Sequence, residues 1–553
     1  MNKQRSYLSR IRNISWRTRI SLAAAIVGVT SVSAWGVVSL SELLVVGTVH
    51  TAVFTKTPQS VFNNLVSHGK NAEAFELAFE TGDTLFGTEF NALDGSGNNV
   101  GNGERFSHVP RSDLRGPTQW FNHTPARVTG PNARSCAHCH NKPVEDGAGD
   151  SAANVHRDPR RNGVIGEFIQ RNTPHLFGQG GLQVLAEEMT TELRAKLAAA
   201  IAGCTSNGCS ATVTLVSKGV DFGTVVITRT DPGPTPPNNC SGTDAVPFID
   251  PVDCLAGVTA DITGLRGIGR DAVVRPFQWK GAVAFVRDFN RDASNNEIGM
   301  QPVETAGTGD GDFDGVSEEL GIGDETALAV YIAAQPRPTT RQELARLKLI
   351  PALSYAENAA IGRGGKVFNT VGCASCHMPS LTIDKAIFTE PSQNPNFRDE
   401  VFPSGADPLA LGVNPARPVR FDLTRDQPDN RVKDSYGREF RLGSFEPGPC
   451  HGSAIVRAYG DLKRHEMGPR LAEQVDEIGS GASMWLTENL WGVGSTAPYL
   501  HDGRATTLTE AILEHGGEAQ ASRDQFAALT PAQKKDLVAF LDNLVLFVVP
   551  TVE

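Results

Sequence analysis

Two pentapeptides carry the residue types best suited to chemistry: Cys136-Ala137-His138-Cys139-His140 and Cys373-Ala374-Ser375-Cys376-His377. In a C-x-x-C-H motif, two thiols one helical turn apart can form thioethers with the vinyl groups of a haem, and the adjacent histidine can bind the iron. A redox dithiol or half of a zinc site could use the same cysteines. Because both copies end in histidine, the pattern favours two covalently bound c-type haems.

The N-terminal segment indicates where such a protein would work. Residues 1–19 carry six Lys or Arg side chains and no acidic one, and residues 20–41 carry no charge. A basic start followed by an apolar run predicts export, and this run is also long enough to span a bilayer. We therefore expect a periplasmic protein whose residues 1–50 are either a cleaved signal peptide or an inner-membrane anchor. Haem attachment outside the cytoplasm agrees with this location.

The composition limits the class of protein and of partner. The chain has 553 residues, of which 40% are hydrophobic and 20% charged, a globular composition. The 51 basic and 62 acidic residues give a net charge of 51 − 62 = −11. No broad basic footprint exists, so a nucleic-acid partner is excluded.

The second motif has neighbours typical of a cytochrome c fold. Residues 359–368 are expected to form a helix leading into the motif, with Gly364 and Phe368 one turn apart. Near the end of the chain, Thr530 and Pro531 supply an N-cap and a first-turn proline for another helix. That helix has an apolar stripe at helical spacing: Leu537, Phe540, Leu541 and Leu544. Residues 82–86 repeat the glycine and phenylalanine spacing before the first motif, followed by a long loop-rich excursion.

Residues 203–262 differ in composition from their surroundings. The β-branched runs 213–216 and 224–228 are bounded by Gly and Pro, which predicts a small β insertion. This stretch also contains four cysteines, and three pairings of them exist. The simplest pairs are Cys204–Cys209 and Cys240–Cys254. Cys450 is left over, as a free or buried thiol.

An acidic loop follows at residues 310–315. Asp310, Asp312 and Asp314 alternate, and a glycine stands at the sixth place, as in the first half of an EF-hand loop that binds Ca²⁺. The twelfth place is Gly321, where a bidentate Glu is expected, although Glu318 or Glu319 could substitute. A solvated acidic loop without a metal is the alternative.

The expected fold class is therefore mainly α, with two cytochrome c-like haem domains, long loops and a small β insertion. The expected divisions are these: 1–50, signal peptide or anchor; 51–202, N-terminal haem domain; 203–262, β-rich insertion; 263–345, the rest of the N-terminal region with the calcium loop; 346–553, C-terminal haem domain.

Eight segments together resemble the di-haem oxidoreductase family, whose relatives include bacterial dihaem cytochrome c peroxidases and MauG. These segments are residues 130–140, 171–177, 277–281, 287–291, 299–301, 373–377, 459–468 and 490–503. The resemblance implies that peroxide reacts at the N-terminal haem and that the C-terminal haem relays electrons. It implies hydrogen peroxide as substrate and a small redox protein or quinone-linked donor as partner. A dihaem electron-transfer cytochrome and a dihaem oxygenase are the alternatives.

The same resemblance suggests residues around the first haem. His156 lies at a spacing from His140 similar to that of a displaceable distal histidine in the family, with a surface histidine as the alternative reading. His175 and Gln301 are polar residues in the family motifs that could line the distal pocket. Acid–base help is needed there to move a proton between the two peroxide oxygens.

For the second haem, the sixth iron ligand should come from downstream. Met467, His465 and His501 compete, and Met467 is favoured because methionine is a soft ligand that raises the haem potential. His465 is the next choice. The family also implies an aromatic bridge between the haems, for which Trp279, Trp485 and Trp491 are equal candidates.

Overall fold

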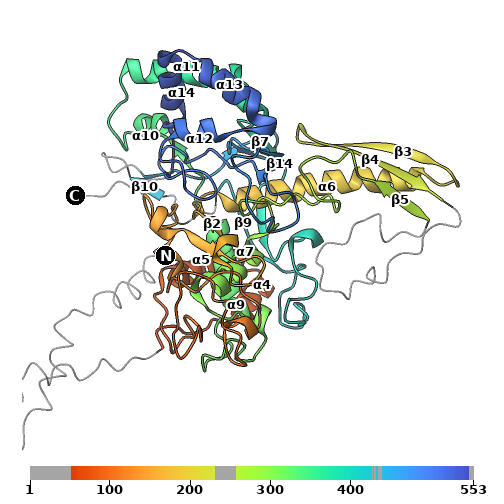
Figure 1. The fold of residues 1–553 in the computed structure, drawn as a ribbon, viewed down its shortest axis with the longest axis vertical. Coiled ribbons are helices and arrows are strands. Elements are labelled where there is room, and N and C mark those ends of the chain that lie inside the picture. Colours follow the sequence, from red (N-terminus) through yellow and green to blue (C-terminus); the bar gives the residue numbers. More distant parts are fainter. Residues whose placement is uncertain (1–51, 231–256, 426–427, 429–430, 434–438, 547–553) are drawn as a thin grey trace, which may run out of the picture. The chain divides into compact units, whose positions relative to one another are not determined.

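The computed structural model describes residues 52–230, 257–425, 428, 431–433 and 439–546 (Figure 1). The expected export segment and the expected Cys240–Cys254 pair lie outside these residues. Among the helices that are described, none has both the length and the apolar character needed to cross a membrane. More of the chain lies in helices than in strands, and the sheets are small, so the mainly α character is confirmed.

The α-helices of the described residues range from one turn to seven. They are α4 (Gln59–Ser67), α5 (Asn71–Gly87), α6 (Gln179–Gly203), α7 (Val286–Ala293), α8 (Val303–Ala306), α9 (Ile322–Ala333), α10 (Arg341–Arg346), α11 (Tyr355–Thr370), α12 (Leu508–Glu514), α13 (Gln520–Ala528) and α14 (Pro531–Leu541). A π-helix, Ser294–Ile298, directly continues α7.

The strands form small antiparallel sheets of two or three members. They are β1 (Val155–Arg157) with β2 (Ile169–Arg171); β3 (Ser210–Ser217), β4 (Val220–Arg229) and β5 (Val258–Asp261); β6 (Thr339–Thr340) with β16 (Leu544–Val545); β7 (Leu381–Ile383), β13 (Ala454–Val456) and β12 (Glu446–Pro447); β8 (Ile387–Glu390) with β9 (Val419–Asp422); β10 (Arg431–Lys433) with β11 (Glu439–Arg441); and β14 (Arg464–Glu466) with β15 (Met484–Leu486).

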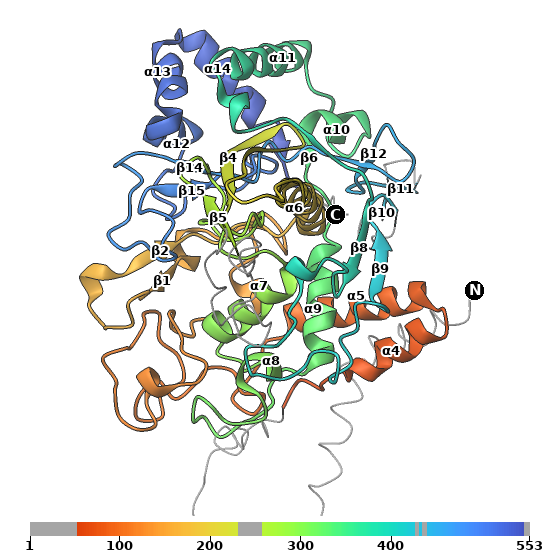
Figure 2. The same cartoon turned by 90° about the vertical axis from the view of Figure 1, so that its right-hand side faces the viewer.

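The helix that precedes each C-x-x-C-H motif packs closely on a later helix. In both views α11 lies beside α14, and α5 lies near α9 (Figures 1 and 2). A Cβ at Gly364 of α11 would overlap the Asp536 carbonyl of α14, and a Cβ at Gly82 of α5 would overlap the Ala327 carbonyl of α9. Glycine is needed at both crossings because the backbones approach so closely. The repeated glycine spacing therefore marks two equivalent helix contacts.

Local sequence accounts for the start of these helices. Ser354 and Glu357 form a capping box at α11, in which the Glu357 amide donates to Ser354 Oγ at 3.2 Å. At α14, Thr530 caps the helix and Pro531 occupies its first turn, as expected. The predicted stripe residues are buried, and the Phe540 and Phe368 rings pack with centroids 5.2 Å apart. Leu544, however, lies in β16 and not in the helix, because α14 ends at Leu541.

The predicted β insertion is present as the β3–β4–β5 sheet, which contacts α6 (Figure 1). The runs 213–216 and 224–228 lie in β3 and β4. The Cys204–Cys209 disulfide is confirmed where α6 ends. The inward side chains of this sheet, among them Leu215, Phe222 and Ile227, are buried and belong to the same hydrophobic core as α5, α6, α7 and α9.

Candidate functional site

The two C-x-x-C-H motifs adopt the same backbone turn. Cys136–His138 and Cys373–Ser375 each form a short 3-10 helix. The His140 amide donates to the Cys136 carbonyl at 3.1 Å, and the His377 amide donates to the Cys373 carbonyl at 3.0 Å. All four thiols are free of disulfides. In each motif, the thiols and the histidine line a cavity with mainly apolar walls.

The first cavity, of about 150 Å³, is bounded by the first motif, the 171–176 segment, Trp279, and the end of α7 with its π-helix. Among the described residues that line it, His140 is the one side chain with an imidazole, and no Met or Tyr lines it. His140 Nδ1 lies 3.3 Å from the Gly147 carbonyl. Because a carbonyl can only accept, Nδ1 carries the proton and Nε2 keeps its lone pair. Burial lowers the pKa of His140 to about 4, so the ring is neutral, as a metal ligand must be.

The second cavity, of about 240 Å³, is lined by five histidines, of which His377 and His515 have rings close to each other. His377 Nδ1 lies 3.2 Å from the Tyr459 carbonyl, and His515 Nδ1 lies 2.8 Å from the Ala511 carbonyl. By the same argument, both rings keep a free lone pair on Nε2. Burial lowers the pKa of both histidines, that of His377 to about 4. The ring centroids are 6.4 Å apart.

This separation suits two ligands of one metal ion. Imidazoles bound at about 2 Å on opposite sides of a metal place their ring centres roughly 6 Å apart. His515 was missed by the sequence reasoning, since it directly follows the short helix α12 and belongs to no C-x-x-C-H motif. Its only sequence signal was its residue type.

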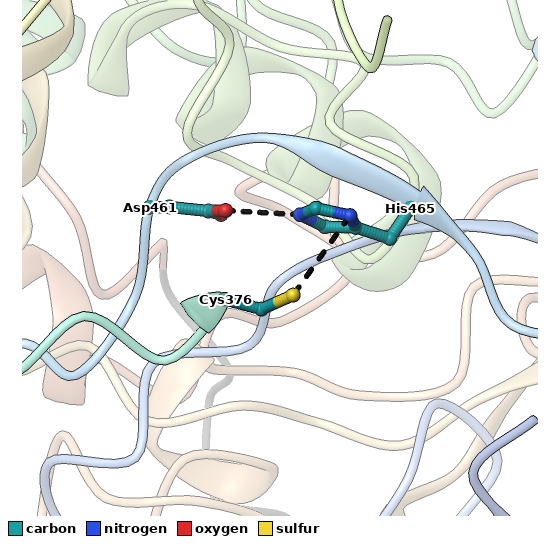
Figure 3. Close-up of side chains that lie close together, drawn as sticks. All are labelled: Cys376, Asp461 and His465. Atoms are coloured by element: carbon teal, nitrogen blue, oxygen red, sulfur yellow. Dashed lines mark hydrogen bonds and ion pairs between the residues drawn. The ribbon is translucent and has the colours of Figure 1, made fainter. Parts of the chain in front are cut away.

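His465 also lines the second cavity, but its ring is held by acidic groups. Its Nε2 lies 2.9 Å from Asp461, and its Nδ1 lies 3.9 Å from Cys376 Sγ (Figure 3). The same Nδ1 lies 2.8 Å from Glu518. Burial lowers the pKa of His465, but hydrogen bonds to Asp461 and Cys376 outweigh it and raise the pKa to about 10. A protonated ring has no lone pair for a metal, so this arrangement does not support His465 as a ligand.

Met467 and His501 complete the set of predicted sixth ligands, and both lie in the wall of the second cavity. His501 stacks on Trp485 with centroids 3.9 Å apart, and burial lowers its pKa to about 3. The ring that faces His377 is nevertheless that of His515. Ligation by Met467 stays a prediction.

The three residues predicted to serve the first haem do not meet in its cavity. His156 lies on β1 between Val155 and Arg157, which both line the cavity. Because neighbouring side chains of a strand point to opposite faces, His156 points away, toward Gln170 at 3.2 Å.

His175 and Gln301 are fully engaged elsewhere. The His175 ring accepts from the Phe177 amide at 3.2 Å and donates to the Trp491 carbonyl at 3.0 Å, and it lines the second cavity. The Gln301 amide accepts from the Gly311 amide at 3.0 Å and donates to the Thr124 carbonyl at 3.2 Å. Gln301 therefore anchors the acidic loop and lines neither cavity.

Glu297 is the acid–base candidate that the structure brings to the first cavity. It lies in the π-helix, a distortion that often occurs at functional sites. Its Oε1 accepts from Thr129 at 3.4 Å, and its buried Oε2 has no hydrogen-bond partner among the described residues. Burial raises the pKa of Glu297 to about 7. The flanking segments 287–291 and 299–301 were among those that resemble the family. The sequence analysis did not identify Glu297, which lies between them.

One wall is common to both cavities. Trp279 and residues 172–174 line each of them. The Trp279 indole N–H donates to the Asn172 carbonyl at 2.9 Å, which holds the ring in this wall. Trp485 lines only the second of the two cavities. Trp491 lines a smaller, third cavity, which shares Pro174 and Trp279 with the other two. Of the three tryptophans, Trp279 is thus the one in contact with both sites.

The acidic loop lies apart from both cavities. Carboxylate oxygens of Asp310, Asp312 and Asp314 lie within 4.8 Å of one another. Arg127 pairs with Asp312 at 3.0 Å, and Arg105 pairs with Asp314.

Comparisons with known proteins agree in part with this site. Residues 450–544 match the family model described as "Di-haem oxidoreductase, putative peroxidase". This segment includes His465, Met467, His501 and His515. No protein with a curated description matches the chain significantly.

Two solved structures give weak matches. Hydrazine synthase of Kuenenia stuttgartiensis is 19% identical, with a TM-score of 0.19, over 41% of this chain and 57% of that one. A MauG-like protein associated with microbial copper homeostasis is 17% identical, with a TM-score of 0.22, over 48% of this chain and 68% of that one. The chain thus spans little more than half of the hydrazine synthase chain. TM-scores this low do not establish a common fold with either protein.

Proposed function

We propose, from the match of residues 450–544 to the di-haem oxidoreductase family model, that the chain is a dihaem c-type redox enzyme. In this proposal hydrogen peroxide is reduced at the first cavity with electrons that enter through the second. The family name supports haem as the cofactor. Covalent attachment, peroxide as substrate and the direction of electron flow are our proposal.

The observation that carries the proposal is the difference between the two cavities. Among the described residues, the first cavity offers one imidazole, His140, and the second offers the neighbouring pair His377 and His515. A haem held by His140 alone would remain accessible to a small substrate, whereas one held by both His377 and His515 would be suited to electron transfer. A pure electron carrier would need two closed sites.

The residues present fit two c-type haems. Each cavity provides two free thiols for thioether bonds, a neutral proximal imidazole and mainly apolar walls. When bound, each haem supplies an iron that exchanges one electron, so two haems together hold the two electrons that convert H₂O₂ and two protons into two water molecules.

Glu297 moves the proton in this scheme. As a carboxylate it takes a proton from one peroxide oxygen and returns it to the other, so that water can leave. The unpartnered Oε2 is available for this because no described residue hydrogen-bonds it. Trp279, which lines both cavities, would carry electrons between the two sites.

Location and partners complete the proposal. The basic and apolar N-terminal segment, residues 1–50, would direct the chain to the periplasm and either leave it there or anchor it to the inner membrane. A small redox protein or a quinone-linked donor would refill the second site.

The proposal is tested on holoprotein made in a host with haem-attachment machinery. The denatured protein should retain the mass of two haems, and the reduced protein should consume peroxide anaerobically with two electrons per molecule. Cyanide should bind at one site. If the holoprotein neither consumes peroxide nor binds cyanide in any redox state, the electron-transfer cytochrome is the better reading. Consumption of O₂ with an organic substrate, without reaction with peroxide, would favour an oxygenase.

A further inference from the structure

A cluster of buried carboxylates stands outside both cavities and is not balanced by protein cations. Asp312 and Asp314 have side chains with 0% exposure, and Asp310 is partly exposed beside them. Glu319, 1% exposed, lies close enough to interact electrostatically with Asp312 and Asp314. Four carboxylates therefore share this region.

Two guanidinium groups lie against the cluster, from Arg105 and Arg127. Four negative and two positive charges leave a local charge of −2. Buried charges without a counter-charge are costly, so a cluster of this kind calls for a further cation or for protons.

The second observation is a set of orphaned oxygens. Asp312 Oδ1 and Glu319 Oε1 are buried and have no hydrogen-bond partner among the described residues. Asp312 also belongs to the group of three aspartates that each have a carboxylate oxygen within 4.8 Å of the others, so its buried unpartnered oxygen lies in the same cluster. Buried polar atoms in proteins nearly always have a partner.

We propose that residues 310–319 bind one divalent cation, and that Ca²⁺ is the cation preferred. The ligand atoms are all oxygens, which suits hard cations, and a deformable loop accommodates the larger Ca²⁺ better than Mg²⁺. One 2+ ion would neutralise the −2 charge. Asp310, Asp312 and Asp314 are the ligands, and the nearby Glu319 completes the charge balance.

The loop is joined to the first cavity by two connections. Gln301 accepts from the Gly311 amide through its side chain, and its own amide donates to Glu319 at 2.7 Å. Arg127 bridges Asp312 and the Gly299 carbonyl at 3.2 Å. Gln301 and Gly299 directly follow the π-helix that carries Glu297. A bound cation would thus brace the segment that positions Glu297.

The test is a calcium titration of the full holoprotein after treatment with a chelator, followed by calorimetry. We expect one site with a dissociation constant on the order of 10⁻⁵ to 10⁻³ M, weaker binding of Mg²⁺, and a higher melting temperature with Ca²⁺. Asp310→Asn and Asp312→Asn should each weaken binding at least about tenfold, or 1.4 kcal/mol.

Asp407→Asn is the matched control, because Asp407 is an exposed turn aspartate that accepts from the Leu409 amide and lies outside the cluster. It should bind Ca²⁺ as the parent does. If Asp312→Asn does not fold, Asp310→Asn decides, since Asp310 accepts from two amides of its own loop, at Asp314 and Gly315, and an asparagine oxygen can keep one of them. Absence of calcium binding at millimolar concentration, or unchanged binding in Asp310→Asn, overturns the proposal. Because the readout is calorimetric, its failure would leave the peroxidase proposal untouched.

Discussion

At the scale of single residues, the histidines of the second cavity differ in which ring nitrogen is free. The Nδ1 protons of His377 and His515 are held by backbone carbonyls, which directs both Nε2 lone pairs into the cavity. His465 is instead held by a carboxylate at each nitrogen. The neighbours of a histidine therefore decide whether it can bind a metal.

We predict that His515, rather than Met467, is the sixth ligand of the second haem. His515→Ala should convert that haem from a low-spin to a high-spin optical and paramagnetic resonance spectrum, because one axial ligand is lost. Met467→Ala is the control and should keep the spectrum of the parent. A thioether–iron charge-transfer band in the parent that disappears in Met467→Ala would assign the ligand to Met467 instead.

Glu297 should impose a pH dependence on peroxide turnover. Burial raises its pKa to about 7, and the proposed role requires the carboxylate, so the rate should rise as pH increases through about 7 and fall below it. Glu297→Gln should lower the rate by roughly 10²- to 10⁴-fold and remove this limb of the profile. The measurement is the initial rate of peroxide consumption from pH 5 to 9. A Gln variant that keeps both rate and profile would exclude Glu297 as the base.

At the scale of elements, the crossing of α11 and α14 positions the second motif. α11 ends at Thr370, three residues before Cys373, so a shift of the helix would move the thiols. Its contact with α14 depends on Gly364, where a side chain would meet the Asp536 carbonyl and, at 2.7 Å, Phe540 Cβ.

We predict that Gly364→Ala destabilises the protein by about 1–3 kcal/mol, because the added methyl group forces the two helices apart. Gly362→Ala, in the same helix, is the matched control. A Cβ at Gly362 would meet no atom within 4 Å, so alanine should be neutral or stabilising by up to about 1 kcal/mol. Denaturant unfolding followed at the haem absorption band measures both. Equal effects of the two substitutions would contradict the packing argument.

At the scale of the whole molecule, the two cavities are adjacent although their motifs are 373 − 136 = 237 residues apart. Residues 172–174 and Trp279 form the wall common to both, and the neighbouring Arg171 guanidinium, which lines the first cavity, pairs with Glu473 and Glu477 of the C-terminal half. The N-terminal and C-terminal halves therefore meet at the site itself.

Trp279→Phe should slow electron transfer between the two sites at least about tenfold, which corresponds to 1.4 kcal/mol of barrier. The substitution keeps an aromatic ring but removes the indole and its hydrogen bond to Asn172. The measurement is stopped-flow oxidation of the second haem after peroxide is mixed with fully reduced protein. Trp491→Phe, which lines neither main cavity, should behave as the parent. If both variants transfer electrons at the parental rate, the path avoids Trp279.

The sequence by itself determined the features whose signals are local. Each C-x-x-C-H motif is contained in five consecutive residues. The capping residues of α11 and α14 contact groups within one helical turn, and the Cys204–Cys209 disulfide closes a short turn. The β-branched runs 213–216 and 224–228 likewise predicted β3 and β4. Each of these depends on neighbours along the chain, which a single sequence displays directly.

Only the tertiary structure decided which side chains complete each cavity. His515 lies 515 − 377 = 138 residues after His377, and Glu297 lies 297 − 140 = 157 residues after His140. No periodicity links such positions, because they meet only when helices and loops from different parts of the chain pack together. His156 is an opposite case, in which sequence spacing suggested a contact that the fold does not make. Its spacing to His140 suggested a ligand, but side chains alternate along β1, so its ring points away from the cavity.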